Sequence, residues 1–245
     1  MCPAFFVRAV QTPPTALVVP AAGSGRRLGL GPPKALVDVG GMPLLVATLQ
    51  CFAPIDAIVE VVVAAPPAAI GEVTRALAAL GWEGRELRVV AGGSTRQASV
   101  RAALGAVSSR AELVCVHDAA RPLVRPSTIE RVLQAAARHG AAAAAHRAAD
   151  SIRQQDETGV ARPVDRSRVF LVETPQAFER GLLIRAHDRA RVTGIEATDD
   201  AELVERCAQG RVHLVETAGG NPKVTTSEDL ELVRAVIAWR RATHR

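Results

Sequence analysis

The sequence of residues 16–34, ALVVPAAGSGRRLGLGPPK, decides the fold. Its apolar start predicts a short buried strand over residues 16–20, and a glycine-rich loop follows directly. Small residues allow backbone N–H groups to approach a phosphate chain, and glycines allow the turns that this needs. Arg26, Arg27 and Lys34 add positive charge to the same loop. We therefore expect a strand of an α/β sheet that ends in an anion-binding loop.

Two familiar phosphate-binding motifs do not fit this loop. The glycines Gly23, Gly25 and Gly29 give the spacing G-x-G-x-x-x-G, and no acidic residue lies about 20 positions further on, so a dinucleotide site is not indicated. Lys34 does not stand in the GK[ST] context of a P-loop. The loop therefore predicts a phosphate site of a different kind, although a plain surface loop is the alternative.

Strand and helix patterns alternate over the first 140 residues. Strands are predicted at 16–20, 58–65, 87–91 and 113–117, and helices at 43–52, 67–80, 94–107 (with Ser94 as N-cap) and 127–138. This alternation is typical of a parallel sheet covered by helices on both faces. Such sheets bind ligands at the carboxyl ends of their strands. The segments that directly follow strands, residues 21–34, 92–99 and 118–121, are therefore the candidate site.

The alternation breaks after Gly140. Residues 141–147 are nearly all alanine, which favours a helix, but the sheet order requires a strand and we predict one. Residues 148–168 are polar without a helical stripe and predict a β-arm with its turn near 156–159. Helices at 181–190 and 199–207, a strand at 211–216 and a closing helix at 227–242, capped by Ser227, complete the chain. The predicted fold is thus α/β, a single Rossmann-like domain over residues 1–245 with a mostly parallel central sheet, an extension at 1–14 and a protruding β-arm.

Composition excludes several other classes of function. The net charge is +5, but the arginines are scattered without interleaved aromatics, so nucleic-acid binding is not expected. No apolar run reaches the roughly 18 residues that span a membrane, and the four cysteines lack metal-ligand or redox spacing. We expect a cytoplasmic protein.

Lysine occurs only at Lys34 and Lys223 in this arginine-rich chain, which raises the question of what the two lysines do.

Two further motifs follow predicted strands. In GGSTRQASV, residues 92–100, two glycines and several hydroxyls suit close contact with a base or ribose, although an ordinary helix cap is the alternative. In VHDAARPLV, residues 116–124, Asp118 and Arg121 suit a metal–phosphate unit or polyol hydroxyls, with a buried structural pair as the alternative. We interpret His117 as a packed histidine rather than a base.

The motifs together resemble one family. In chain order they are AAGSGRR, PPK, GG with a serine six residues after the second glycine, HDAARP, DS, VDR, TPQ, TDD and NPKVT. This set resembles 2-C-methyl-D-erythritol 4-phosphate cytidylyltransferases, from about Ala16 to the last helix. Three positions depart from the usual pattern, namely Ser94 for an acid, Ser151 for threonine and Asp200 for glutamate.

The resemblance implies an activity and a set of site residues. The enzyme would join CTP to a polyol phosphate, 2-C-methyl-D-erythritol 4-phosphate, and release pyrophosphate with Mg²⁺ as cofactor. Arg27 and Lys34 would stabilise the transition state, and Arg166 and Lys223 would position the acceptor phosphate. The implied nucleotide-binding residues are Ala21, Ala22, Gly23, Gly25, Gly93, Ser94 and Ser99. The implied substrate-binding residues are Asp118, Arg121, Ser151, Thr174 and Thr198; the metal ligands stay open.

The resemblance also implies a homodimer in which the arm, with Ser151 and Arg166, crosses to the partner. Three alternatives remain at this stage. A ribitol-5-phosphate cytidylyltransferase would share fold and chemistry. A more distant alternative is another sugar-phosphate nucleotidyltransferase, a sugar-1-phosphate enzyme whose loop is also glycine-rich and basic. A catalytically inactive nucleotide-binding module is of a different class, and the retention of Lys34 and Lys223 argues against it.

Overall fold

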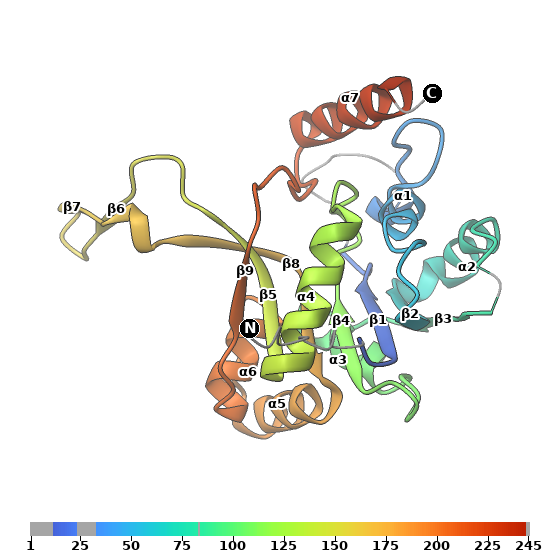
Figure 1. Cartoon of the computed structure of the whole chain (residues 1–245), viewed down its shortest axis with the longest axis horizontal. Helices are drawn as coiled ribbons and strands as arrows, with labels where there is room; N and C mark the ends of the chain where they lie inside the picture. Colours follow the sequence, from blue (N-terminus) through green and yellow to red (C-terminus); the bar gives the residue numbers. More distant parts are fainter. Residues whose placement is uncertain (1–11, 24–32, 83, 244–245) are drawn as a thin grey trace, which may run out of the picture.

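The computed structural model describes residues 12–23, 33–82 and 84–243 of the chain. At its centre lies a seven-stranded sheet in the order β3-β2-β1-β4-β8-β5-β9 (Figure 1). The strands are β1 (Thr15–Pro20), β2 (Ile58–Ala65), β3 (Glu86–Ala91), β4 (Leu113–Val116), β5 (Ala141–Arg147), β8 (Phe170–Glu179) and β9 (His213–Glu216). β1, β2, β3 and β4 pair in parallel, as do β5 and β9. The predicted α/β fold with a mostly parallel sheet is confirmed.

β8 is the antiparallel strand of this sheet and joins its two parallel parts, since it pairs with both β4 and β5. The sequence predicts no strand there, because Glu173, Pro175 and Gln176 interrupt the apolar pattern. The pairing of β5 with β8 shifts register between Ala143 and Ala145. A proline cannot donate to a ladder and is tolerated at such an irregularity. This explains how the segment is accommodated inside the sheet.

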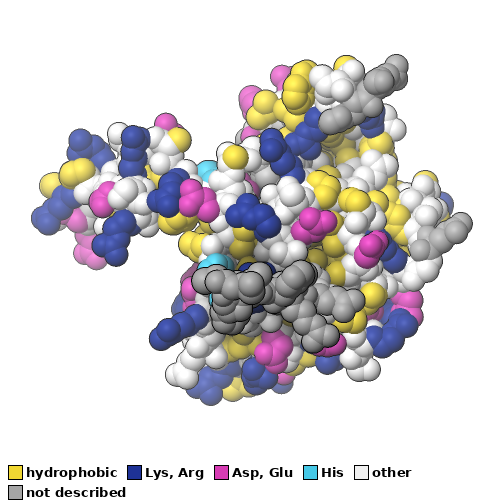
Figure 2. Space-filling model, viewed as in Figure 1, with side chains coloured by type: hydrophobic (Ala, Val, Ile, Leu, Met, Phe, Trp, Pro, Cys, Tyr) yellow, Lys and Arg dark blue, Asp and Glu magenta, His cyan; other side chains and the backbone are white. Residues whose placement is uncertain are grey.

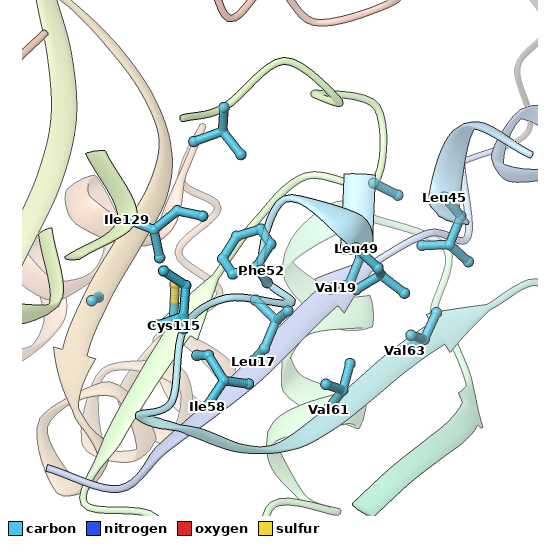
Figure 3. Packing of buried hydrophobic residues seen from close by; sticks show 14 of the residues in the cluster. Leu17, Val19, Leu45, Leu49, Phe52, Ile58, Val61, Val63, Cys115 and Ile129 are labelled. Atoms are coloured by element: carbon cyan, nitrogen blue, oxygen red, sulfur yellow. The ribbon is translucent and has the colours of Figure 1, made fainter. Parts of the chain in front are cut away.

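Helices cover both faces of the sheet. One face carries α1 (Leu44–Gln50), α2 (Ile70–Ala78) and α4 (Pro126–His139), and the other carries α3 (Arg96–Leu104), α5 (Arg180–Thr193) and α6 (Asp200–Ala208). The alternation along β1 shows the reason, because Leu17 and Val19 pack toward the first face while Ala16 and Val18 pack toward the second. Figure 3 shows the first core, in which Phe52 lies among strand and helix side chains. The last helix, α7 (Ser227–Thr243), packs on a third cluster that includes Val37.

The alanine-rich segment forms the strand β5, as predicted. Gly140 ends α4 with φ 82°, and its N–H bonds to the carbonyl of Ala136. Such a left-handed residue turns the chain back into the sheet. The side chains of residues 141–145 are fully buried between neighbouring strands and helices. Tertiary packing therefore overrides the helix propensity of alanine here.

The predicted arm is present and projects from the body of the molecule (Figure 1). It contains β6 (Arg153–Gln155) and β7 (Ala161–Pro163), paired antiparallel, and the short 3-10 helix η4 (Arg166–Arg168). At its turn the side chain of Asp156 accepts from the backbone N–H groups of Thr158 and Val160. Basic side chains gather on the arm in the space-filling view (Figure 2).

Two helix caps differ from the prediction. Thr95, not Ser94, caps α3, and its hydroxyl accepts from the backbone N–H of Ala98 at 3.0 Å. At the start of α7 the backbone N–H of Asp229 reaches the hydroxyl of Thr226 at 3.3 Å, one residue before the expected Ser227. In both cases neighbouring hydroxyl residues can serve as the cap, and the sequence does not show which one does.

Within the residues described, no helix is both long and apolar enough to cross a membrane.

Candidate active site

A cavity of about 640 Å³ opens at the carboxyl edge of the sheet. It is lined by loops that follow β1, β3 and β4, by the start of the 3-10 helix η2 (Lys34–Leu36) and by the segment before α7. Nine predicted site residues line it, namely Ala21, Ala22, Gly23, Lys34, Gly93, Ser94, Ser99, Asp118 and Lys223. The volume suits a nucleotide-sized ligand. The prediction that the post-strand segments meet is confirmed.

Close packing explains the two glycines after β3. A Cβ at Gly92 would lie 2.4 Å from the Cβ of Ala22, and one at Gly93 would lie 2.5 Å from the Cβ of Ala98. The hydroxyl of Ser99 accepts from the N–H of Gly93 at 3.2 Å and holds the turn. Only glycine therefore allows the loop after β3 to lie directly against the loop after β1, and together they form one wall of the cavity.

Asp118 is the charged centre of the opposite wall. Its Oδ2 lies 2.9 Å from Nζ of Lys223 and 3.6 Å from Nε of Arg121, while its Oδ1 accepts from Nε of Arg96 at 2.9 Å. Burial works to raise the pKa of this carboxyl, but Arg96 and then Lys223 outweigh it and hold the pKa well below its usual range. Asp118 is therefore ionised at neutral pH and is saturated with cationic partners.

A second layer of contacts fixes these groups. The hydroxyl of Thr174 accepts from the backbone N–H of Asp118 at 3.1 Å. The side-chain amide of Asn221 donates to the carbonyl of Thr174 at 3.0 Å, and Arg121 donates to the carbonyl of Asn221 at 2.7 Å. Arg121 and Thr174 thus lie behind the cavity wall and hold the segment that carries Lys223.

His117 is packed, as interpreted from the sequence. It is fully buried, stacks edge-on against Phe52 with ring centroids 4.9 Å apart, and its Nε2 lies 3.0 Å from the carbonyl oxygen of Arg121. Burial lowers its pKa to about 4, an effect that the hydrogen bond to Arg121 partly offsets. The ring is therefore neutral at neutral pH and carries the N–H that donates to Arg121.

The other predicted residues lie elsewhere. Gly25 and Arg27 fall outside the described residues. Ser151 and Arg166 are exposed on the arm, where Arg166 donates to the carbonyl of Ala149. Thr198 is exposed beside α6, and its hydroxyl donates to Glu202 at 2.8 Å. Ser151, Arg166 and Thr198 are not among the described residues that line the cavity.

The charges of the cavity favour an anion. Lys34, Arg96 and Lys223 line it together with a single carboxylate, Asp118, among the described residues. Among all the described residues, no group of three or more His, Cys, Asp or Glu side chains could hold a metal ion. Asp118 already contacts Lys223 and Arg96, so the described residues do not form a metal cage. They fit a polyanion such as a triphosphate.

Arg96, and the contact that Asp200 makes with it, are site features that the sequence motifs do not predict. Arg96 lines the cavity and also contacts Asp200, whose Oδ2 lies 2.7 Å from its Nη1. Both residues belong to motifs used above, GGSTR and TDD, but no signal in the sequence shows that the two motifs contact each other.

Comparison with known proteins points to a single family. The model of the family "2-C-methyl-D-erythritol 4-phosphate cytidylyltransferase" matches residues 15–238. Proteins of that name from Symbiobacterium thermophilum and Streptomyces coelicolor are 42% and 43% identical over 226 and 240 residues, covering 91% and 93% of this chain and 93% and 86% of theirs. The crystal structure of the Thermus thermophilus protein is 39% identical with a TM-score of 0.75, covering 91% of this chain and 98% of that one. A 4-diphosphocytidyl-2C-methyl-D-erythritol synthase from Anaerococcus prevotii superposes with a TM-score of 0.82 at 25% identity, covering 93% of this chain and 100% of that one.

Proposed function

The chain belongs to the 2-C-methyl-D-erythritol 4-phosphate cytidylyltransferase family, and from this premise we propose that its cavity is where CTP and the acceptor phosphate react. The enzyme transfers the cytidylyl group of CTP to 2-C-methyl-D-erythritol 4-phosphate, giving 4-diphosphocytidyl-2-C-methyl-D-erythritol and pyrophosphate. One observation gives the strongest support for placing the reaction in this cavity. The only two lysines of the chain, Lys34 and Lys223, line the same cavity although they are far apart in sequence.

The reaction needs positive charge and positioning more than a protein base. An oxygen of the acceptor phosphate attacks the α-phosphorus of CTP, the bond to the bridging oxygen breaks, and pyrophosphate leaves. The attacking oxygen is already ionised near neutral pH. Preorganised cations then stabilise the charge that develops at the five-coordinate phosphorus. We assign this role to Lys34 and Arg27; the neutral, buried His117 has no part in it.

The two walls of the cavity have different tasks in this proposal. The loops after β1 and β3, with Ala22, Gly23, Gly93 and Ser99, receive the nucleotide through backbone groups and a hydroxyl. The wall around Asp118 receives the acceptor, whose phosphate pairs with Lys223. Two observations support this division: Gly92 packs closely against Ala22, so the two loops form one wall, and Lys223 is held by its ion pair with Asp118 in the other.

We propose that Mg²⁺ binds through the triphosphate of CTP rather than through a protein cage. Mg²⁺ is usually held by one or two carboxylates together with substrate phosphates. The single described carboxylate that lines the cavity, Asp118, is already paired with Lys223 at 2.9 Å. When bound, the ion would neutralise charge on the triphosphate.

We further propose a homodimer in which each arm completes the partner's cavity. Arg166 and Ser151 are exposed on the arm, away from their own chain's cavity lining. The arm and its base also expose apolar side chains, with Val160 55%, Leu171 48% and Val172 39% exposed. A two-fold axis would bury these side chains and give two equal sites.

Mixing two inactive variants tests the shared site. Lys34→Ala and Arg166→Ala chains are allowed to exchange, and mixed dimers are counted by mass spectrometry. If the arm crosses, a mixed dimer holds one site with both defects and one with neither, so about a quarter of all sites regain activity after random exchange. Mixed dimers that stay as inactive as their parents would show that Arg166 serves its own chain.

Pyrophosphate release tests the activity itself. The enzyme is assayed with CTP or UTP against 2-C-methyl-D-erythritol 4-phosphate, ribitol 5-phosphate and a sugar 1-phosphate. We expect efficient release only from CTP with the first acceptor. Good turnover with ribitol 5-phosphate and none with the erythritol compound would contradict the assignment.

We also propose a reducing, cytoplasmic setting, which the free thiols of Cys51, Cys115 and Cys207 support.

A further inference from the structure

Arg96 connects two buried carboxylates that belong to different elements. Its Nε donates to Asp118 at 2.9 Å, at the end of β4, and its Nη1 donates to Asp200 at 2.7 Å, in the first turn of α6. The exposed fractions of these two aspartates are only 5% and 1%. Two buried negative charges on one side of a phosphate-binding cavity are costly unless a cation lies between them.

The Asp200 end of this bridge is held by contacts with β8 and α5. The side chain of Gln176, on β8, accepts from the backbone N–H groups of Asp200 and Ala201 at 3.2 and 3.1 Å and donates to Asp199 at 2.9 Å. Nε2 of the buried His187 lies 3.4 Å from Asp200. Gln176 therefore ties the backbone at Asp200 to the sheet, while the buried carboxylate of Asp200 lies between His187 and the guanidinium of Arg96.

The near end of the connection is shared with Lys223. Arg96 takes Oδ1 of Asp118, which leaves Oδ2 for the ammonium of Lys223 at 2.9 Å. The two cations therefore contact opposite oxygens of one carboxylate. Without Arg96, Asp118 could rotate and turn both oxygens toward Lys223 and Arg121, and the ammonium would move with it.

From these contacts we infer that Arg96 is a positioning residue, which by bridging Asp200 and Asp118 fixes the Asp118 carboxylate and thereby the Lys223 ammonium against the acceptor phosphate. This rests on the proposed function, because it takes the acceptor phosphate as the partner of Lys223. The guanidinium suits the task, since its rigid fork contacts two carboxylates at once, whereas a lysine ammonium offers a single point of charge.

A purely structural role makes a different prediction. If Arg96 served only to neutralise Asp200 during folding, removal of the charge on Asp200 would make the guanidinium dispensable. Replacing a buried ion pair by neutral groups of similar volume is often tolerated by the fold. The comparison must therefore be made in a background where Asp200 is already neutral.

Two double variants provide this comparison. Arg96→Lys/Asp200→Asn keeps a cation for Asp118, and Arg96→Met/Asp200→Asn removes it, while both lack the charge on Asp200. We measure kcat, the KM for each substrate and the melting temperature, with Arg101→Met on the exposed side of α3 as the matched control. We expect the Met double variant to lose about 10²-fold in kcat, as for a reacting group displaced by roughly 1 Å, and the Lys double variant to retain at least tenfold more.

A second contrast tests the bridge itself. In the single variant Arg96→Lys one ammonium faces both Asp118 and Asp200, so its kcat should be lower than that of Arg96→Lys/Asp200→Asn. If the Met double variant does not fold, Arg96→Gln/Asp200→Asn gives the same charge difference from the Lys double variant.

Equal kcat for the two folded double variants would overturn the inference, as would a loss confined to the melting temperature. Failure of the proposed function would look different. In that case the wild-type enzyme itself would release no pyrophosphate from CTP and 2-C-methyl-D-erythritol 4-phosphate.

Discussion

Protonation of His117 should make the protein less stable in mild acid. The ring is fully buried between Phe52 and the carbonyl of Arg121, beside Asp118 at the end of β4. Burial lowers its pKa from 6.5 to about 4; the hydrogen bond to the carbonyl of Arg121 and the charge of Asp118 oppose this shift, while the positive charges of Arg121 and Arg96 add to it. The folded state therefore holds a neutral imidazole over a pH range in which the unfolded state binds a proton.

The sign and size of the effect follow from this difference in pKa. His117 contributes stability that is present above its unfolded pKa of 6.5 and is lost as the pH falls toward the folded value of about 4. One pKa unit corresponds to about 1.4 kcal/mol. Between pH 7 and pH 4.5 the free energy of unfolding should fall by roughly 2 to 3 kcal/mol through His117 alone. That is a large share of the 5–15 kcal/mol typical of a domain.

Urea denaturation at pH 7.0 and pH 4.5 measures this loss, in wild type and in His117→Gln. The glutamine amide can still donate to the carbonyl of Arg121 but does not titrate. The chosen window lies above the ordinary pKa of aspartate, so Asp118 and Asp200, both held below that value, contribute little. We expect the variant to lose roughly 2 kcal/mol less than wild type over the same step. An equal loss in both proteins would refute the reasoning, because it would mean that His117 takes up its proton without unfolding.

Three further predictions concern the cavity. Lys34→Ala and Arg27→Ala should lower kcat by about 10²–10³-fold with a smaller effect on CTP binding, measured by steady-state kinetics; a normal kcat with a raised KM for CTP would make either residue a ground-state binder. Isothermal calorimetry should detect Mg²⁺ binding only with CTP present, and comparable binding to the nucleotide-free enzyme would show that protein groups hold the ion. Gly92→Ala should raise the KM for CTP at least about tenfold, because its Cβ would lie 2.4 Å from that of Ala22 and the loops must separate. Gly71→Ala, whose Cβ meets nothing within 4 Å, is the matched control, and an equal KM in both variants would contradict the packing argument.

The sequence is sufficient to predict where the cavity lies. Gly23, Gly93 and Asp118 each follow a strand by a few residues, and carboxyl ends of parallel strands lie at one edge of a sheet. The hydrophobic pattern of the strands and the glycine-rich turns after them therefore place these three residues at the same edge of the sheet, even before the strand order is known. The arm is equally predictable, since a polar segment without a helical stripe cannot pack into the core.

The features that sequence does not predict depend on contacts between distant segments. β8 carries Glu173, Thr174 and Gln176 as buried polar residues, and their partners lie on other elements. A polar residue in a strand normally indicates exposure. Only the assembled sheet shows that each of these groups has a hydrogen-bonding or charged partner, so the local pattern misleads.

The placement of the cations shows how the same charge is used in two ways. Arg96 must satisfy two fixed carboxylates that lie apart, which requires a planar group with several donors in a defined geometry. Among the described residues, Lys223 forms an ion pair with Asp118, and its side chain lines the cavity and remains 38% exposed. A compact ammonium on a flexible stem can follow a phosphate oxygen as the reaction proceeds, whereas a guanidinium in that place would recruit a second acceptor. In a chain that uses arginine almost everywhere else, lysine at this position therefore fits a group that contacts substrate, and arginine at position 96 fits one that supports it.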